Sequence, residues 1–138
     1  SWRKMGMVVL GAPLLFFGLG YYGTTHYPAH NFKTPDTAAQ WQTLHPTLRL
    51  ALWLVSLEDR RMVLTDIARR PGEYAEMGLQ KQGASPHYLH GDGHAHAVDL
   101  RVSNVGEARN WARQGLFLFM GLDAVRHTGT ADHLHLAL

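Results

Sequence analysis

The longest uninterrupted apolar stretch of this chain lies close to its N-terminus. Residues 5–22 carry no charged side chain and follow the basic pair Arg3 and Lys4. A helix of about 17–25 apolar residues can cross a bilayer, and such a helix tolerates the glycines and the proline found here. We therefore predict a single N-terminal transmembrane helix within residues 1–24, with its basic end in the cytoplasm. A cleavable signal peptide and a buried helix of a soluble domain are the alternatives.

The next part of the chain is polar and is interrupted by prolines. Residues 25–45 include Pro28 and Pro35, and we interpret them as a linker with one short helix that begins at Asp36. Residues 47–60 then place leucine, alanine and valine on one helical face. This pattern predicts an amphipathic helix of the folded domain.

Shorter apolar segments occupy the rest of the chain. Within residues 96–102, Ala97, Asp99 and Arg101 alternate with three aliphatic residues, which is the two-residue period of a strand. Further strands are predicted over residues 62–67, 122–126 and 133–138, and helices over residues 73–80 and 104–119. This order of elements predicts a small α+β domain over residues 46–138, with a short antiparallel sheet and flanking helices.

Composition and charge narrow the possible classes of function. The chain has 138 residues, which suits one folded domain beside the apolar N-terminal stretch. It contains no cysteine, so disulfides and thiolate metal ligands are excluded. The formal net charge is +2, and the basic residues are dispersed rather than grouped with aromatic residues. Nucleic acid is therefore not indicated as a partner.

The histidines are concentrated in the second half of the chain. Seven of the 10 histidines lie between His87 and His135, and the same stretch contains Asp92, Asp99 and Asp132. Imidazole and carboxylate groups that converge from separate segments suit Zn²⁺. A run of solvated loop histidines and an artificial tag are the alternatives, but a strand-like segment follows the histidines directly. We therefore predict a zinc site.

Three short motifs resemble one family of enzymes. The family pattern has Ser-x-His, then Ala-x-Asp, and later an acidic residue shortly before a ligand histidine. The matching segments are Ser85-Pro86-His87-Tyr88, Ala97-Val98-Asp99-Leu100 and Asp132-His133-Leu134-His135. Over residues 46–138 the chain is thus similar to the hedgehog/D-alanyl-D-alanine zinc peptidases. That family includes D,D-carboxypeptidases and L-alanyl-D-glutamate endopeptidases, which cut the stem peptides of peptidoglycan.

The resemblance implies a role for each matching residue. The residues that match the zinc ligands of the family are His87, Asp99 and His135. Asp132 would act as general base on the zinc-bound water, and His133 would donate a hydrogen bond to the developing oxyanion. Arg69, in a segment that resembles the arginine-bearing strand of the family, would hold a carboxylate of the substrate.

One spacing departs from the family pattern. The family separates its first histidine and its aspartate by seven positions, whereas His87 and Asp99 are twelve positions apart. Residues 89–93 can form an inserted loop that leaves His87 as the ligand, and this interpretation keeps the local Ser-Pro-His-Tyr setting. Alternatively His90 or His94 has taken over as ligand, or the site has lost its activity.

These observations together predict a function and a location. We expect a single-pass, membrane-anchored zinc metallopeptidase that hydrolyses peptidoglycan stem peptides on the periplasmic side of the bacterial inner membrane. The alternative is a non-catalytic, peptidase-like subunit that serves a membrane complex as a structural or cell-wall-binding module.

Overall fold

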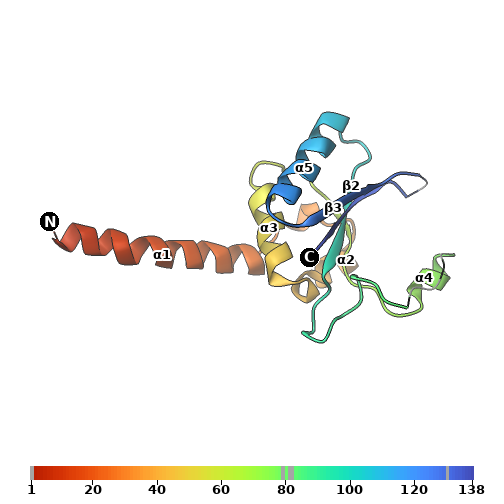
Figure 1. Ribbon diagram of the computed structural model, residues 1–138, viewed down its shortest axis with the longest axis horizontal. Coiled ribbons are helices and arrows are strands. Elements are labelled where there is room, and N and C mark those ends of the chain that lie inside the picture. Colours follow the sequence, from red (N-terminus) through yellow and green to blue (C-terminus); the bar gives the residue numbers. More distant parts are fainter. Residues whose placement is uncertain (1, 79, 81–82, 130) are drawn as a thin grey trace.

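The computed structural model describes residues 2–78, 80, 83–129 and 131–138, with side chains from residue 11 onward. Its elements in chain order are α1 (Trp2–Thr25), η1 (Ala29–Asn31), α2 (Pro35–Ala39), η2 (Trp41–Thr43), α3 (Pro46–Ser56), β1 (Leu64–Asp66), α4 (Glu73–Glu76), β2 (Ala97–Arg101), α5 (Glu107–Phe119), β3 (Asp123–His127) and β4 (His133–Ala137). The strands form one antiparallel sheet in the order β1-β2-β4-β3 (Figure 1). The predicted α+β class with a short antiparallel sheet is confirmed.

One face of the sheet packs on α3 and α5 and forms the core. Helix α3 begins with Pro46 in its first turn, and the side chain of His45 accepts a hydrogen bond from the amide of Thr47. Helix α5 ends shortly before Gly121, which has a φ of 85° and so adopts a backbone conformation that suits glycine. The apolar side chains that meet in the core include Leu48, Leu52, Val55, Leu64, Val98, Leu100, Phe117, Leu134 and Leu136.

The opposite face of the sheet carries polar side chains. Because side chains alternate along a strand, Asp99 and Arg101 of β2 lie on the face opposite Val98 and Leu100. Asp99 is the register partner of His135 on β4, and Arg101 is the register partner of His133. Strand pairing therefore brings the polar residues of two distant segments to the same place.

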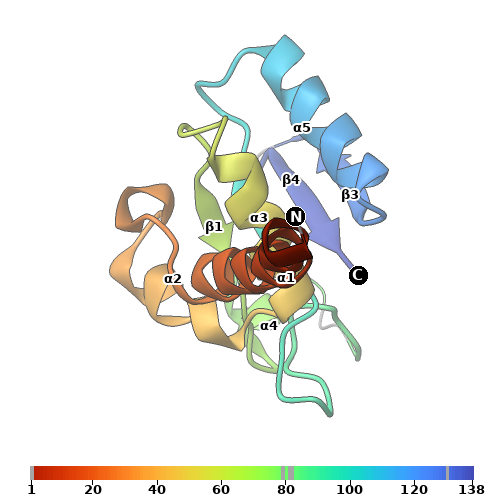
Figure 2. The same ribbon diagram turned by 90° about the vertical axis from the view of Figure 1, so that its left-hand side faces the viewer.

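Helix α1 extends away from the rest of the molecule (Figures 1 and 2). Its last turn packs on α3, where the Cβ of any residue that replaced Gly23 would lie 2.3 Å from an atom of the Trp53 ring. The guanidinium of Arg49 also donates a 2.7 Å hydrogen bond to the carbonyl of Thr24. Farther from this contact, the apolar side chains that are exposed are those of Leu14, Leu15, Phe16, Phe17 and Leu19.

The helix itself agrees with the prediction, but its membrane crossing is not supported. Within the described part of the chain, no helix is long and apolar enough to cross a membrane. Residues 5–10, which supply the first part of the predicted span over residues 5–22, have side chains outside the described part.

The segment predicted as a linker, residues 25–45, packs on the domain. Trp41 and Leu44 are buried in the core, and Phe32 forms a parallel bridge with Leu64 of β1. The short helix α2 is capped by the side chain of Thr34, which accepts a hydrogen bond from the amide of Thr37. Three short helical turns follow one another here, so the apolar residues follow no single helical or strand period.

Candidate metal centre

Three of the residues predicted to bind metal come together on the polar face of the sheet. Nε2 of His87 lies 3.3 Å from Oδ1 of Asp99, and Nδ1 of His135 lies 2.8 Å from the same oxygen. The two ring nitrogens are 3.3 Å apart. These residues therefore form a group that could hold a metal ion, with one ligand atom from each within 4.8 Å of the others.

Each of the three comes from a different segment. Asp99 and His135 face each other because β2 and β4 pair in that register. His87 lies in the loop before β2, where its amide donates a hydrogen bond to Oγ of Ser85, and Ser85 in turn bonds to the hydroxyl of Tyr74. His87 is almost fully buried, with 2% of its surface exposed.

The imidazole of His87 is oriented for metal binding by a backbone carbonyl. Its Nδ1 lies 2.7 Å from the carbonyl oxygen of Ile67. A carbonyl only accepts hydrogen bonds, so Nδ1 carries the proton and Nε2 presents its lone pair to Asp99 and His135. Histidines that bind metals commonly have this arrangement, with the second ring nitrogen held by a carbonyl or a carboxylate.

The spacing of the three ligand atoms fits a tetrahedral ion. Zinc bonds of about 2.0–2.1 Å in a tetrahedral arrangement separate neighbouring ligand atoms by about 3.3–3.5 Å. The two distances that involve His87 match this separation, and the 2.8 Å hydrogen bond from His135 to Asp99 would have to widen by about 0.5 Å. An ion would displace the proton in that hydrogen bond, which is the usual accompaniment of metal binding.

Asp99 is buried but ionised. Burial disfavours its charged form, yet the close contacts with the imidazoles of His135 and His87 outweigh burial and hold the pKa of the carboxyl well below its usual range. Its second oxygen, Oδ2, accepts a 3.0 Å hydrogen bond from Arg69. Asp99 thus presents Oδ1 to the histidines, while its Oδ2 is bonded to Arg69.

Arg69, predicted to bind substrate, is occupied with protein carboxylates. Its guanidinium pairs with Asp66 and with Asp99, and it lies over the ring of Tyr74 at 4.8 Å from the ring centre. Burial alone would lower the pKa of Arg69, but the two carboxylates raise it above its ordinary value. The structure therefore places Arg69 as a support for Asp99, beside the cleft.

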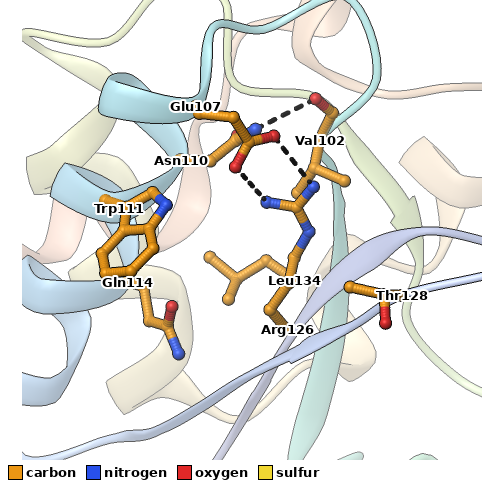
Figure 3. A pocket seen from close by; sticks show the side chains of 8 residues that line it. All are labelled: Val102, Glu107, Asn110, Trp111, Gln114, Arg126, Thr128 and Leu134. Carbon is orange, nitrogen blue, oxygen red and sulfur yellow. Dashed lines mark hydrogen bonds and ion pairs between the residues drawn. The ribbon is translucent and has the colours of Figure 1, made fainter.

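The two residues predicted to act in catalysis have different surroundings. Nε2 of His133 lies 3.7 Å from Oδ1 of Asp99, next to the candidate ligands. The carboxylate of Asp132 instead receives two hydrogen bonds from Arg126, at 2.6 and 2.8 Å. The same arginine also bonds to Glu107 of α5, on the α5 side of the sheet (Figure 3). The structure thus brings His133 to the metal centre and joins Asp132 to a separate ion-pair network.

Arg126 and Glu107 line a smaller cavity of about 330 Å³ between α5 and the sheet, whereas Asp132 lines the larger cleft onto which the candidate ligands open. Figure 3 shows the guanidinium of Arg126 reaching the carboxylate of Glu107. The cavity is further lined by Trp111, Gln114 and Leu134, and no predicted site residue lines it.

The three candidate ligands open onto a larger cleft of about 690 Å³. Arg101, which the sequence analysis did not assign to the site, also lines this cleft. Among the described residues its side chain has no hydrogen bond or ion pair, in contrast to Arg69. The sequence could have predicted this position of Arg101, because Arg101 follows Asp99 by two residues on a strand and so lies on the same face of the sheet.

The histidines of the inserted loop do not join this centre. The structure brings His87, rather than His90 or His94, to Asp99 and His135. His96 instead belongs to a second group with His45 and Asp92. The loop that lengthens the spacing from His87 to Asp99 therefore leaves His87 beside Asp99 and His135.

Comparison with known proteins adds no relative. No family model, no curated protein and no solved structure matches this chain. The resemblance to zinc peptidases therefore stays a prediction from the motif residues.

Proposed function

We propose that this chain is a zinc-dependent peptidase that hydrolyses peptidoglycan stem peptides. The observation that supports this best is the convergence of His87, Asp99 and His135 at the wall of an open cleft. Catalytic zinc sites commonly have three protein ligands and keep a fourth position for water. Zinc held there would supply a water molecule of pKa near 7 and would polarise the scissile carbonyl.

The residues around the ligands suit the binding of a peptide. His133 lies beside Asp99, and because its Nδ1 faces the carbonyl of Ala131, it is the doubly protonated ring that would donate from Nε2 to an oxyanion beside the ligands. Arg101 lines the same cleft and is the arginine we assign to a substrate carboxylate, in place of Arg69. Arg69 bonds to Oδ2 of Asp99 and so fixes the orientation of this carboxylate.

One observation favours a second candidate, a non-catalytic cell-wall-binding or structural module. Asp132, the residue expected to act as general base, is held in two hydrogen bonds by Arg126. These bonds lower the pKa of Asp132 and so weaken it as a base. A protein with this fold that binds peptidoglycan without cleaving it would need the cleft but not the base.

We further propose that α1 anchors the domain at the outer side of the bacterial inner membrane, as a single pass. The support comes from the described part of α1, where Leu14, Leu15, Phe16 and Phe17 are exposed on a helix that extends away from the domain. Large exposed apolar patches mark surfaces that meet a membrane or another protein.

The decisive experiment measures metal content and peptidoglycan cleavage on the same preparations. The full chain should retain tightly bound zinc and should release peptide fragments from purified peptidoglycan, detected by mass spectrometry. His87→Ala should lose cleavage and the one zinc ion of this centre, whereas His30→Ala, which alters an exposed histidine outside both histidine groups, should keep both. Zinc binding together with peptidoglycan binding but no cleavage would favour the non-catalytic module. A full chain that neither binds zinc nor acts on peptidoglycan would reject both proposals.

The role of Arg101 is tested on the same substrate. A hydrogen bond to a charged group contributes about 1.5–3 kcal/mol, so Arg101→Ala should lower kcat/KM by roughly 10- to 150-fold. Arg101→Lys should recover part of this loss, because the charge returns without the planar fork. If Arg101→Ala retains zinc and full kcat/KM, the assignment of Arg101 is wrong while the peptidase proposal stands.

A further inference from the structure

A second group of histidines surrounds Asp92, away from the candidate metal centre. The rings of His90 and His96 are stacked with their centres 4.1 Å apart, and the ring of His45 meets that of His96 edge-on at 5.0 Å. The ring of His94 is 5.8 Å from that of His45. Four imidazoles from two segments are thus gathered around one carboxylate.

Asp92 connects these imidazoles. Its Oδ2 lies 2.7 Å from Nε2 of His96 and 3.9 Å from Nε2 of His45. Its Oδ1 lies 3.9 Å from Nδ1 of His94 and accepts a 2.9 Å hydrogen bond from the amide of that residue. The amide bond fixes the direction of the carboxylate, so that it faces the imidazoles of His45 and His96.

We propose that His45, Asp92 and His96 form a second metal site, which binds a divalent transition ion such as Zn²⁺. One ligand atom from each residue lies within 4.8 Å of the others. Imidazole nitrogen together with carboxylate oxygen is a donor set that suits zinc, copper and nickel, and it disfavours ions that require only oxygen. His45 and His96 are half-buried and Asp92 is exposed, so the site is open to ions from solution.

The site joins two parts of the chain that backbone pairing already brings together. The amide of His45 donates a 3.0 Å hydrogen bond to the carbonyl of Ala95, and the amide of Ala95 donates one of 2.8 Å to Thr43. Beyond this contact, residues 88–94 form a loop that the carbonyl of His94 closes by accepting a 2.9 Å bond from the amide of His90. Nδ1 of His45 accepts a hydrogen bond from the Thr47 amide, so an ion at Nε2 would displace the ring proton to Nδ1 and replace that hydrogen bond. An ion bound by His45 would tie the loop to the beginning of α3.

The position of the loop gives the second site its role. The loop connects His87 to β2, which carries Asp99, and it contains the residues that lengthen the spacing between these two candidate ligands. An ion at the second site would therefore hold the inserted loop against the segment of His45. It would limit the motion of the neighbouring segment that contains His87. This role is structural, and it does not require that the first site be catalytic.

The test begins with the metal stoichiometry of the full chain. After removal of metal with a chelator, titration with Zn²⁺ and with Ni²⁺, followed by calorimetry, should show two binding events. His96→Ala and His45→Ala should each remove one event, whereas His87→Ala should remove the other. His26→Ala is the matched control, because it replaces an exposed histidine outside both groups, and it should keep both events. The replaced side chains of the second site are half-buried, and circular dichroism without metal verifies that these variants fold.

Hydrogen exchange then tests the structural role. Zinc should slow the exchange of amides in residues 88–96 of the wild-type chain but not in His96→Ala.

The titrations can overturn the proposal in two ways. One binding event in the wild type that is lost in His87→Ala and unchanged in His96→Ala would overturn the proposal. Two events that both survive in His45→Ala and His96→Ala would overturn it as well, because the second ion would then lie elsewhere. One event that is lost only in His96→Ala would support the second site and reject the first, so the two proposals fail separately.

Discussion

Residues outside the candidate metal centre fix the orientation of its ligands. His87 is held by the carbonyl of Ile67, and Asp99 is held by Arg69. Such outer contacts set the direction and the protonation of the ligands, and their loss typically costs about 10- to 100-fold in metal affinity. The candidate ligands are therefore organised without an ion, and we treat Arg69 as a positioning residue.

This view of Arg69 makes a prediction that differs from a substrate-binding role. Arg69→Ala should lower both zinc affinity and stability, because it leaves the buried Asp99 and the half-buried Asp66 without their counter-ion. Removing one partner of a buried ion pair costs about 3–5 kcal/mol, and the partial exposure of Asp66 places this variant near the lower end. Urea unfolding and zinc titration measure the two effects.

The neighbouring arginine provides the matched control. Arg70 pairs with Glu73 at the surface, so Arg70→Ala should change neither zinc affinity nor stability appreciably. A stable Arg69→Ala variant with normal zinc affinity but poor cleavage would return Arg69 to the role of substrate ligand.

Short-range motifs predicted some of the site residues but not their partners. His87, Asp99 and His135 were singled out because Ser-x-His, Ala-x-Asp and the final histidine are local patterns. The pairing of Asp132 with Arg126 depends on how β3 and β4 place the two side chains, and no spacing in the sequence reports it. The two carboxylates that occupy Arg69 are likewise set by tertiary packing.

At the scale of elements, a buried ion pair joins the end of α3 to α5. Asp59 follows α3 and pairs with Arg113 of α5, whose side chain is only 2% exposed. Asp59→Asn would leave this guanidinium buried without its counter-ion, and the expected loss is about 3–5 kcal/mol in the free energy of unfolding. Chemical denaturation measures it, and Glu107→Gln is the control, because Glu107 is an exposed partner of Arg126 worth about 0–1 kcal/mol.

The same pair predicts a dependence of stability on pH. Burial of Asp59 favours its neutral form, but hydrogen bonds and charge from Arg113 outweigh this and lower its pKa. Because the folded pKa lies below the unfolded value of about 3.9, the contribution is complete above that pH and is lost as the pH falls through the folded pKa. The difference in stability between wild type and Asp59→Asn should therefore shrink on acidification below about pH 4. A constant difference would contradict this assignment.

The contact between α1 and α3 depends on a glycine. A Cβ at position 23 would overlap the ring of Trp53, so Gly23→Ala should push the two helices apart at a cost of about 1–3 kcal/mol. Gly20→Ala meets no atom within 4 Å and should stabilise α1 by up to about 1 kcal/mol through helix propensity. Hydrogen exchange in the last turn of α1 should thus accelerate in the first variant and slow in the second. Equal exchange in both would mean that α1 does not dock on Trp53.

The elements with a clear period were the ones that could be predicted. Strand β2 was recognised because aliphatic and polar residues alternate through it, and the structure places these two sets on opposite faces of the sheet. The packing of residues 25–45 was missed, because Trp41 and Leu44 are isolated apolar residues between short turns. Their burial depends on the surface that α3 and the sheet offer, which no local pattern contains.

At the scale of the whole molecule, the structure divides into a packed domain and an extended apolar helix. The domain buries its own apolar face, whereas Leu14, Leu15, Phe16 and Phe17 of α1 remain exposed. Burial of such a side chain contributes about 1.5–3 kcal/mol, so the four together provide a strong tendency to leave water. The surface that binds these four side chains would determine the location of the candidate metal centre in the cell.

If a lipid membrane covers α1, the full chain should bind to vesicles made from bacterial phospholipids and float with them in a density gradient. A Leu15→Asp, Phe16→Asp double variant should stay in the aqueous fraction, because an aspartate near the centre of a membrane helix costs about 2.5–3.5 kcal/mol. The double variant should keep the zinc stoichiometry and unfolding midpoint of the wild type, because both replaced side chains are exposed on α1. A wild-type chain that stays in the aqueous fraction without detergent would contradict the membrane proposal, and its elution as an oligomer would indicate that copies of the chain cover the helix instead.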